Sequence, residues 1–478
     1  MELDEEDNEP RQCNRGIGAL RQAPTSLWVI MVITFFEAFA YFTFSYVLVL
    51  YLHEDLGYSD EKAGLYYGIF GVCISIFNVL LGHLVDTLRI KKTLMLANVI
   101  GFVARVLFAL TYNEVVTSAS LFLFMAAGMA IGSPIARTAI RRYTTVKAQS
   151  YAFRIFYVCM NIGAVLAAPC VDALRIYYPD EGIQGFSRYG FLIMITALIH
   201  LLNLMISMVA IKDVQVDEQW NQEPMDNMNR PKLSLRTIKA LLTDKYFWRF
   251  VVFTASTIGV SSTYRYLDAL YPTYMQRVSF AGNFPYMSLL AINPIIVVAL
   301  TVPAELVLGK FHPYHVILVG AAISAVSPLG LVAMQYWGVV LFLIVLTVGE
   351  IIWSPQVNDY VCWLAPPGSE GLFFSLATVP LFAAKVITGA LTGNLLPRFC
   401  PKEGTCDQGW IIWLIVTATT VTSPILLLLT MRFTKVSKPN LLYQKDEEDS
   451  FSGVELDQTE FSTDYLLNDE NAIDDSTL

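Results

Sequence analysis

Long apolar runs separated by short polar stretches organise almost the whole chain. Twelve of these runs have the length of a membrane-spanning helix, which needs about 20 predominantly apolar residues. They cover residues 27–52, 63–85, 92–112, 116–137, 149–174, 188–211, 246–275, 284–309, 314–336, 338–361, 370–396 and 409–431. This pattern predicts an all-α integral membrane protein with twelve transmembrane helices.

A longer polar stretch, residues 212–245, separates the sixth run from the seventh. The two groups, residues 27–211 and 246–431, are nearly equal in length, which suggests an internal duplication. Two six-helix halves are typical of the major facilitator fold. Within the polar stretch, LSLRTIKALL places Leu235, Ile238 and Leu242 on one helical face, which predicts a short amphipathic helix along the membrane surface.

Composition supports a membrane protein and argues against other classes. Hydrophobic residues make up 55% of the chain and charged residues only 15%. The net charge of −9 says little about nucleic acid, because much of it lies in acidic tails at residues 1–26 and 432–478 that we expect to be disordered. No zinc-like spacing, phosphate-binding glycine loop or nucleophile elbow is visible. We therefore expect no enzyme activity, no cofactor, no metal and no nucleic-acid partner.

Lysine and arginine predict the orientation. If both termini are cytoplasmic, the loops on that side hold most of the loop cations, as the positive-inside rule requires. Cys400 and Cys406 would then lie in the last non-cytoplasmic loop, where a disulfide can persist. The acidic tails are compatible with the plasma membrane or the endolysosomal membrane, and Ser476-Thr477-Leu478 resembles a short docking motif for an adaptor protein.

Local motifs add a family resemblance. In the tenth run, GEIIWSPQVNDYVCWLAP resembles the tenth-helix signature of the proton-coupled oligopeptide transporters, the POT or PTR2 family. The family spacing of Gly-Glu, Ser-Pro and Leu-Ala-Pro is kept at Gly349, Glu350, Ser354, Pro355, Leu364, Ala365 and Pro366. FYVCMNIGAVLA, AINPIIVVALTVP and FFEAFAYF are similar to family elements of the fifth, eighth and first helices.

The resemblance implies roles for individual residues. It implies that Glu350 meets the amino terminus of a substrate and that Asn161 and Asn293 hold a peptide backbone. It further implies that Tyr41 lines the pocket and that Glu37 carries a proton. A lone carboxylate inside a membrane costs at least about 2.5 kcal/mol unless it is paired, hydrated or protonated, so such residues are candidates for function on physical grounds as well.

The chain also departs from the family. The family's Glu-x-x-Glu-Arg element reads here Thr34, Glu37 and Ala38, and its fourth-helix Lys-Pro reads Ser133-Pro134. Two cations that the family uses are therefore missing. Other cations inside the runs are candidates for a carboxylate clamp or a charge partner, and these are Arg154, Arg105 and Lys385. We expect both arginines to face the bundle interior.

Each candidate also has a purely structural alternative. Glu350 could pair with Lys385 only to hold helices together, and the two asparagines could bond across helices. Glu37, among four phenylalanines, could be a proton carrier or the buried partner of Arg105 or Arg154. Tyr41 could be packing.

Two further elements concern gating. Arg265 and Asp268 lie three residues apart and could form a local pair or a gate between the halves. Asp86 could cap the second helix and serve as a gating residue by resemblance.

These observations predict a secondary active transporter that works by alternating access. Its substrate would be a small amine-bearing solute, either a short peptide or an amino-acid-like compound, and transport would be linked to protons. Two alternatives remain open. One is an uncoupled facilitator of another organic solute, and the other is a membrane receptor or scaffold of the same fold that does not transport.

Overall fold

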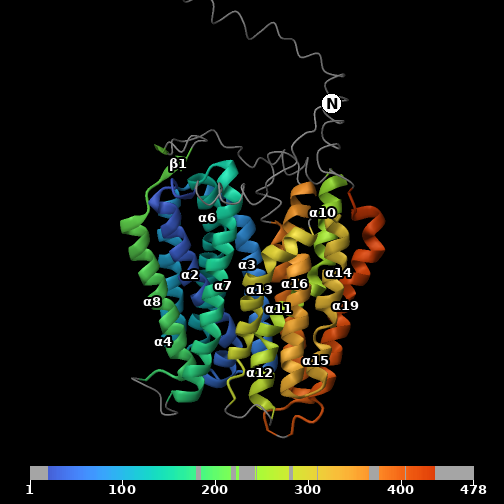
Figure 1. Cartoon of the computed structure of the whole chain (residues 1–478). Helices are drawn as coiled ribbons and strands as arrows, with labels where there is room; N and C mark the ends of the chain where they lie inside the picture. The colour runs from blue at the N-terminus through green and yellow to red at the C-terminus, as the bar shows by residue number, and fades with distance from the viewer. Residues whose placement is uncertain are drawn as a thin grey trace, which may run out of the picture.

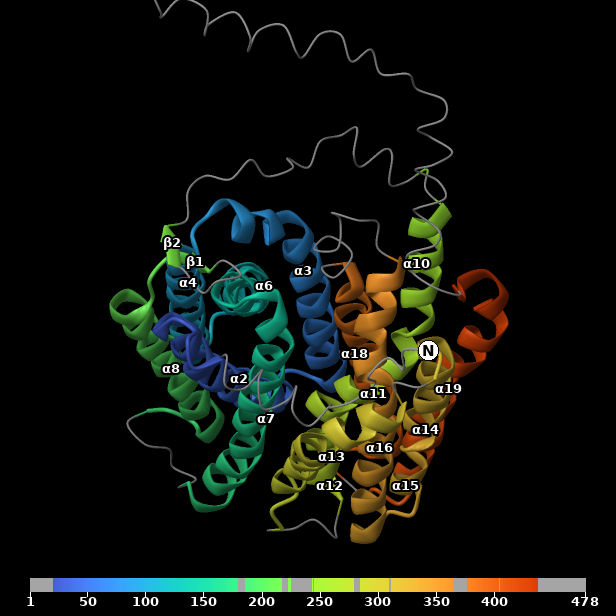
Figure 2. The same cartoon turned by 45° about the horizontal axis from the view of Figure 1, so that its top comes forward.

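The fold is a bundle of long helices that run between two ends of the molecule (Figure 1). It is seen in a computed structural model, which describes residues 20–178, 185–216, 222–224, 243, 245–278, 284–308, 311–364, 376–403 and 405–436. In the view tilted by 45°, the helices form two groups that lie side by side (Figure 2). We call these groups the N-terminal half (α2 to α8) and the C-terminal half (α10 to α19).

The N-terminal half consists of six helical stretches, two of which contain a π-helical segment. They are α2 (Thr25–Leu50) with η1 (Tyr51–Asp55), α3 (Asp60–Thr87), α4 (Ile90–Leu110), α5 (Glu114–Ala119) with η2 (Ser120–Met125) and α6 (Ala126–Tyr143), α7 (Val146–Tyr177), and α8 (Arg188–Ala210).

The C-terminal half is more interrupted. Its elements are α10 (Lys245–Ser256), α11 (Ile258–Asp268), α12 (Leu270–Arg277), η3 (Ser288–Ala291), α13 (Ile292–Leu308), α14 (Pro313–Val326), α15 (Leu329–Val332), α16 (Tyr336–Leu364), α18 (Val379–Phe399) and α19 (Gly409–Thr434).

The predicted fold class is confirmed. Among the described residues, ten helical stretches are long and apolar enough to cross a membrane. The seventh predicted run is divided into α10, α11 and α12, and the eighth into η3 and α13. In the seventh run, hydroxyl side chains bond back to the helix, as when Thr257 Oγ1 donates to the Thr254 carbonyl at 2.7 Å. Such bonds compete with the helical ladder and bend helices, which fits the break at this point.

The connection between the halves contains a small antiparallel hairpin that the sequence pattern does not predict. Strand β1 (Val214–Val216) pairs with β2 (Gln222–Pro224), with Gln215 opposite Glu223. The amphipathic helix expected around Leu235 lies outside the described residues. We call the end of the bundle near this hairpin, where α2 begins, the linker end, and the opposite end the disulfide end.

The packing of the two halves differs between these ends. One hydrophobic core contains residues of both halves, including Phe44 and Phe108 from one and Phe342 and Trp413 from the other. Two further cores each belong to a single half, one built around Ile135 and the other around Tyr314. The halves therefore share a core on the disulfide side and have separate cores toward the linker end.

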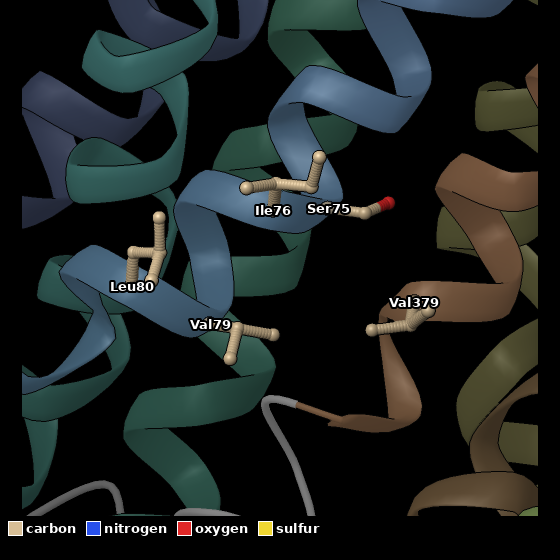
Figure 3. Close-up of a pocket in the computed structure, with 5 residues that line it drawn as sticks. All are labelled: Ser75, Ile76, Val79, Leu80 and Val379. Atoms are coloured by element: carbon tan, nitrogen blue, oxygen red, sulfur yellow. The ribbon is translucent and has the colours of Figure 1, made fainter.

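Helices α3 and α18 form the closest contact between the halves. Gly68 and Gly71 have no side chain to separate the helices, and a Cβ added at Gly71 would lie 2.7 Å from the Lys385 Cβ. Toward the linker end the two helices leave an apolar hollow of about 350 Å³, lined by Ser75, Ile76, Val79, Leu80 and Val379 (Figure 3). The contact is thus tight on the disulfide side and opens along its length.

Candidate functional site

Glu350 lies on α16 and points toward α13 rather than toward α14. The preceding Gly349 allows the close approach of α14, since a Cβ there would lie 2.6 Å from the Ser324 nitrogen. On the other side, Asn293 Nδ2 donates to Glu350 Oε2 at 2.6 Å and lies 3.1 Å from the Thr347 hydroxyl. The structure thus brings together two of the predicted substrate-binding residues, although they are 57 positions apart in the sequence.

No lysine or arginine of the described residues forms an ion pair with Glu350. The sequence alternative of a Glu350–Lys385 pair is not observed, because Lys385 lies elsewhere at the contact of α3 and α18. The groups within electrostatic range of the carboxylate include Tyr264 from its own half and Tyr157 from α7 of the other half. A carboxylate without a cationic partner, reached from both halves, is suited to an ammonium group.

Asn161 lies one turn beyond Tyr157 on α7. Its Nδ2 donates to the Tyr157 carbonyl at 2.8 Å, so this amide bonds within its own helix and not across helices. The helix passes very close to α2, since a Cβ at Gly163 would lie 2.9 Å from the Ala38 Cβ. Ala38, at the position of the family arginine, is therefore packed against α7.

Tyr41 belongs to a network that joins the halves. Arg265 Nη1 donates to the Tyr41 hydroxyl at 2.9 Å and to Asp268 Oδ2 at 2.7 Å. The same carboxylate oxygen accepts from the Tyr67 hydroxyl at 3.1 Å. The local pair of Arg265 and Asp268 is thus observed, and it also bonds to α2 and α3 of the other half.

Lys385 lies next to this network, with a side chain that is only 1% exposed. Its Nζ is 4.7 Å from the Tyr67 ring centre and 4.9 Å from that of Phe70, in the geometry of cation–π contacts. It forms no ion pair with another described residue. Together with Arg265 and one carboxylate, Asp268, it leaves one positive charge in excess when the lysine is protonated.

Glu37 lies in a second polar cluster, which belongs to the N-terminal half. Its Oε2 is 3.4 Å from Nδ1 of His200 on α8, and that nitrogen is also 3.1 Å from Asn98 Oδ1 on α4. Arg105 of α4 is 2% exposed and lies within electrostatic range of Glu37. Sequence reasoning missed His200 and Asn98, although both stand as polar residues within apolar runs, a pattern that marks function or pairing in membranes.

Two predicted residues fall outside these clusters. Arg105 is buried within the bundle, whereas the Arg154 side chain is exposed, with its guanidinium 5.5 Å from the Tyr151 ring centre. Arg154 lies on α7, two turns before Asn161. Asp86 lies in α3, and its side chain is outside the described part of the structure.

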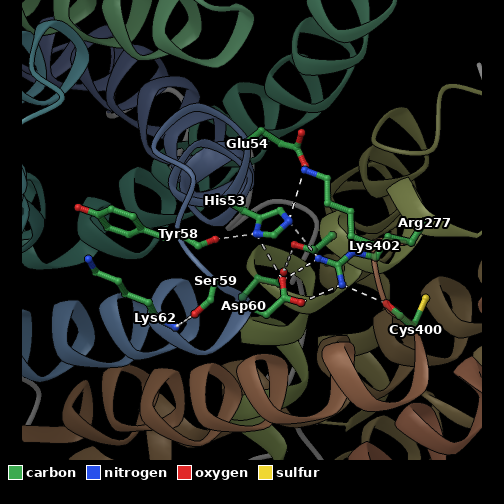
Figure 4. Close-up of polar contacts among 11 residues, drawn as sticks. His53, Glu54, Tyr58, Ser59, Asp60, Lys62, Arg277, Cys400 and Lys402 are labelled. Atoms are coloured by element: carbon green, nitrogen blue, oxygen red, sulfur yellow. Dashed lines mark hydrogen bonds and ion pairs between the residues drawn. The ribbon is translucent and has the colours of Figure 1, made fainter. Parts of the chain in front are cut away.

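The disulfide end holds a polar latch between the halves that the sequence analysis also missed (Figure 4). The guanidinium of Arg277 bonds both oxygens of Asp60, at 2.6 and 3.0 Å, and donates to the Cys400 carbonyl at 3.0 Å. His53 Nε2 lies 3.3 Å from the same guanidinium. Cys400 is joined to Cys406 by a disulfide in the structure. Bidentate pairing of this kind fixes orientation as well as adding energy.

No cluster of three or more histidine, cysteine, aspartate or glutamate side chains placed to hold a metal occurs within the described ranges.

Comparisons with known proteins agree with this geometry. The sequence model of the Major Facilitator Superfamily matches residues 30–389. The chain is 22% identical to the "Uncharacterized MFS-type transporter YqjV" of Bacillus subtilis (strain 168), over 73% of this chain and 80% of that protein.

Among solved structures, the chain resembles two described as a POT family transporter. One is in complex with a thioalcohol-conjugated peptide, with a TM-score of 0.67, 16% identity and coverage of 87% of this chain and 100% of that one. The other is in complex with 5-aminolevulinic acid, with a TM-score of 0.67, 17% identity and the same coverage. At this level of identity the likeness shows the fold.

Proposed function

This chain belongs to the major facilitator superfamily and is a membrane transporter, and we propose that it carries a small amine-bearing solute by alternating access. The solute is a short peptide or an amino-acid-like compound, and its transport is linked to protons through Glu37. One observation carries the proposal above the others. Glu350 is a partly buried carboxylate within the bundle that is hydrogen-bonded by Asn293 yet has no ion-pair partner among the described residues.

The physical argument rests on charge. A carboxylate deep in the bundle is costly when it has no counter-charge, and an ammonium group that enters beside it forms a strong, charge-assisted hydrogen bond. Tyr157 supports a site that includes both halves, because it lies on α7 while Glu350 lies on α16. Alternating access requires a ligand site between the halves, because a ligand that contacts both halves can shift the equilibrium between their two arrangements.

The packing supports a direction of access. The halves share a core and polar bonds on the disulfide side, whereas their cores are separate toward the linker end. We propose that this conformation opens the site at the linker end and that this end is cytoplasmic, with both termini on that side. The disulfide at the other end fits a non-cytoplasmic, oxidising compartment.

The ligand class can be tested with the purified full-length chain. The melting temperature is measured with dipeptides, amino acids and simple amines, and again with analogues whose amine is acetylated. We expect stabilisation by compounds with a free amine, because a ligand that binds only the folded state raises its apparent stability, and none by the acetylated analogues.

A matched pair of variants assigns the effect to Glu350. Glu350→Gln should lose the stabilisation, whereas Glu114→Gln, which alters an exposed glutamate paired with Lys62 at the disulfide end, should keep it. Equal stabilisation by free and acetylated amines contradicts the proposal. Binding without flux in reconstituted vesicles indicates a receptor, and flux that ignores a pH gradient indicates an uncoupled facilitator.

A further inference from the structure

His200 lies at the centre of the polar cluster of the N-terminal half. Its side chain is 5% exposed, whereas that of Glu37 is 39% exposed, so the pair has a buried end and an open end. The imidazole ring packs on Gly101 of α4, where an added Cβ would lie 3.1 Å from the ring. The ring is therefore held in place by the helix contact rather than by its hydrogen bonds alone.

The neighbouring amide indicates which nitrogen of His200 carries the hydrogen. Asn98 Nδ2 donates to the Leu94 carbonyl at 2.9 Å, so its other atom, Oδ1, faces His200. His200 Nδ1 thus lies against two acceptors, this amide oxygen and the carboxylate of Glu37. Nδ1 must donate, which leaves Nε2 with its lone pair in the neutral ring.

That lone pair has no partner in the structure. His200 Nε2 and both polar atoms of the Asn203 side chain are buried and form no hydrogen bond with the described residues. Asn203 follows His200 by three positions on α8, so the two side chains lie on the same face. Asn203 also lies near the Glu37 carboxylate. A buried polar atom without a partner is unfavourable, and a positive charge on the ring would be stabilised by the carboxylate beside Nδ1.

Two charged groups face the ring from the helices packed against α8. Glu37 comes from α2, and Arg105 comes from α4, where its Nη1 lies 3.3 Å from the Gly101 carbonyl. Arg105 opposes a positive charge on His200, and the carboxylate favours it. With one cation and one anion, the cluster is neutral before it takes up a proton and carries one positive charge afterwards.

We propose that His200 and Glu37 form a single proton-binding pair in which His200 Nε2 receives the proton. A hydronium ion transfers its proton to the Nε2 lone pair, which yields an imidazolium and a water molecule, and no other bond changes. Nδ1–H donates to Asn98 Oδ1, and the Glu37 carboxylate, 3.4 Å from Nδ1, is the counter-charge. The inference rests on the proposed function, because it deepens the proton link assigned there to Glu37 alone.

The test follows the protonation of His200 directly. The full-length chain, which has five histidines, is labelled with ¹⁵N-histidine and studied by solid-state NMR in lipid vesicles. His200→Gln identifies the signals of His200 by their loss. His315→Gln, a histidine at the beginning of α14 whose Nε2 lies 2.8 Å from Lys435 Nζ, is the matched control and should remove a different set.

We expect an Nδ1–H neutral ring at alkaline pH that becomes doubly protonated as the pH falls within the range where the protein stays folded. In Glu37→Gln, the doubly protonated fraction at a given pH should fall. A neutral ring with the hydrogen on Nε2, or one that never takes up a proton, overturns the proposal, as does a fraction that does not respond to Glu37→Gln.

The outcomes separate this inference from the proposed function. The NMR measurement needs no substrate, whereas the amine-binding test does not involve His200. A chain whose His200 titrates as expected but that binds no amine retains the proton pair and loses the proposed substrate. The reverse result retains the substrate and loses the pair.

Discussion

Each half of the bundle has one glutamate within its helices that we connect with transport, Glu37 in the N-terminal half and Glu350 in the C-terminal half, and the two carboxylates have different partners. Glu37 lies 3.4 Å from His200 and within range of Arg105, so its charge is balanced within the N-terminal half. Glu350 is bonded by the neutral amide of Asn293 and has no ion pair among the described residues. The difference suggests a division of labour, in which one half binds the coupling proton and the other receives the cationic ligand.

The largest effect is expected from removing the cation of the N-terminal cluster. Arg105→Gln removes a buried guanidinium and leaves the partly exposed Glu37 without its arginine, so we expect a destabilisation of about 3 kcal/mol, near the upper end for a single substitution. The control is Arg154→Gln, which removes an exposed arginine of α7 and should change stability by no more than about 0.5 kcal/mol. Unfolding of both variants in detergent measures the difference. If Arg105→Gln is no less stable than Arg154→Gln, the balanced-charge description of this half is wrong.

The second prediction exchanges the two carboxylates for their amides. Glu350→Gln should weaken binding of an amine ligand by about 2–4 kcal/mol, because the partner of a buried charge is lost. That range corresponds to about 30- to 1,000-fold in affinity. Glu37→Gln should change the affinity at a fixed pH by no more than about twofold, which corresponds to about 0.4 kcal/mol. This variant should instead abolish the pH dependence of uptake. Calorimetric titration and vesicle uptake at two pH values distinguish the two variants. The proposed division between the halves is wrong if both variants lose ligand affinity or if both lose the pH dependence of uptake.

The third prediction removes the asparagine that bonds to Glu350 and, separately, the asparagine that bonds to His200. Asn293→Leu deletes the donor to the Glu350 carboxylate, and a hydrogen bond to a charged group contributes about 1.5–3 kcal/mol. Asn98→Leu deletes the acceptor of His200 Nδ1, a bond to a neutral ring that contributes about 1 kcal/mol. Thermal unfolding of the two variants should therefore rank Asn293→Leu as the less stable. The opposite ranking would indicate that His200 is already charged in the resting protein.

The sequence was sufficient to predict the fold because membrane helices are long apolar runs, and most of the runs coincide with helices of the structure. The exception is informative. The run at residues 246–275 contains several serines and threonines and the Arg265–Asp268 pair, so its apolar pattern is weaker than that of the other runs. In the structure it is divided into α10, α11 and α12. Some of its polar side chains bond within the helix and others bond to the other half. A hydropathy pattern does not predict these partners.

The site was predicted only in part, because its contacts depend on which helices meet. Residue type was enough to select Glu350, and the family resemblance added Asn293, but their direct bond depends on the packing of α13 against α16. The expected alternative partner, Lys385, is displaced from Glu350 because α18 packs on α3 at Gly71. His200 was visible as a polar residue in an apolar run, yet nothing in the sequence shows that α8 places it beside Glu37.

The smallest effect concerns the carboxyl end of the ligand. It tests whether Lys385 takes part in recognition in addition to Glu37 and Glu350. Lys385 is a buried cation without an ion-pair partner among the described residues, next to Arg265 and Asp268. If it receives a carboxylate of the substrate, Lys385→Met should weaken binding of a dipeptide by about 1.5 kcal/mol, the lower end of the range for a hydrogen bond to a charged group. The carboxyl-amidated dipeptide, which keeps the amine for Glu350, should bind as before.

The acid and amide pair separates three explanations in one titration series. A selective loss of the acid in Lys385→Met assigns the anionic end of the substrate to the contact of α3 and α18. Equal loss of both ligands means that Lys385 acts in packing against Tyr67 and Phe70, and the third charge then has no part in recognition. A selective loss of the acid in Arg154→Gln, with Lys385→Met unaffected, moves the clamp to α7. In that case the N-terminal half would bind the anion as well as the proton, and the simple division between the halves would no longer hold.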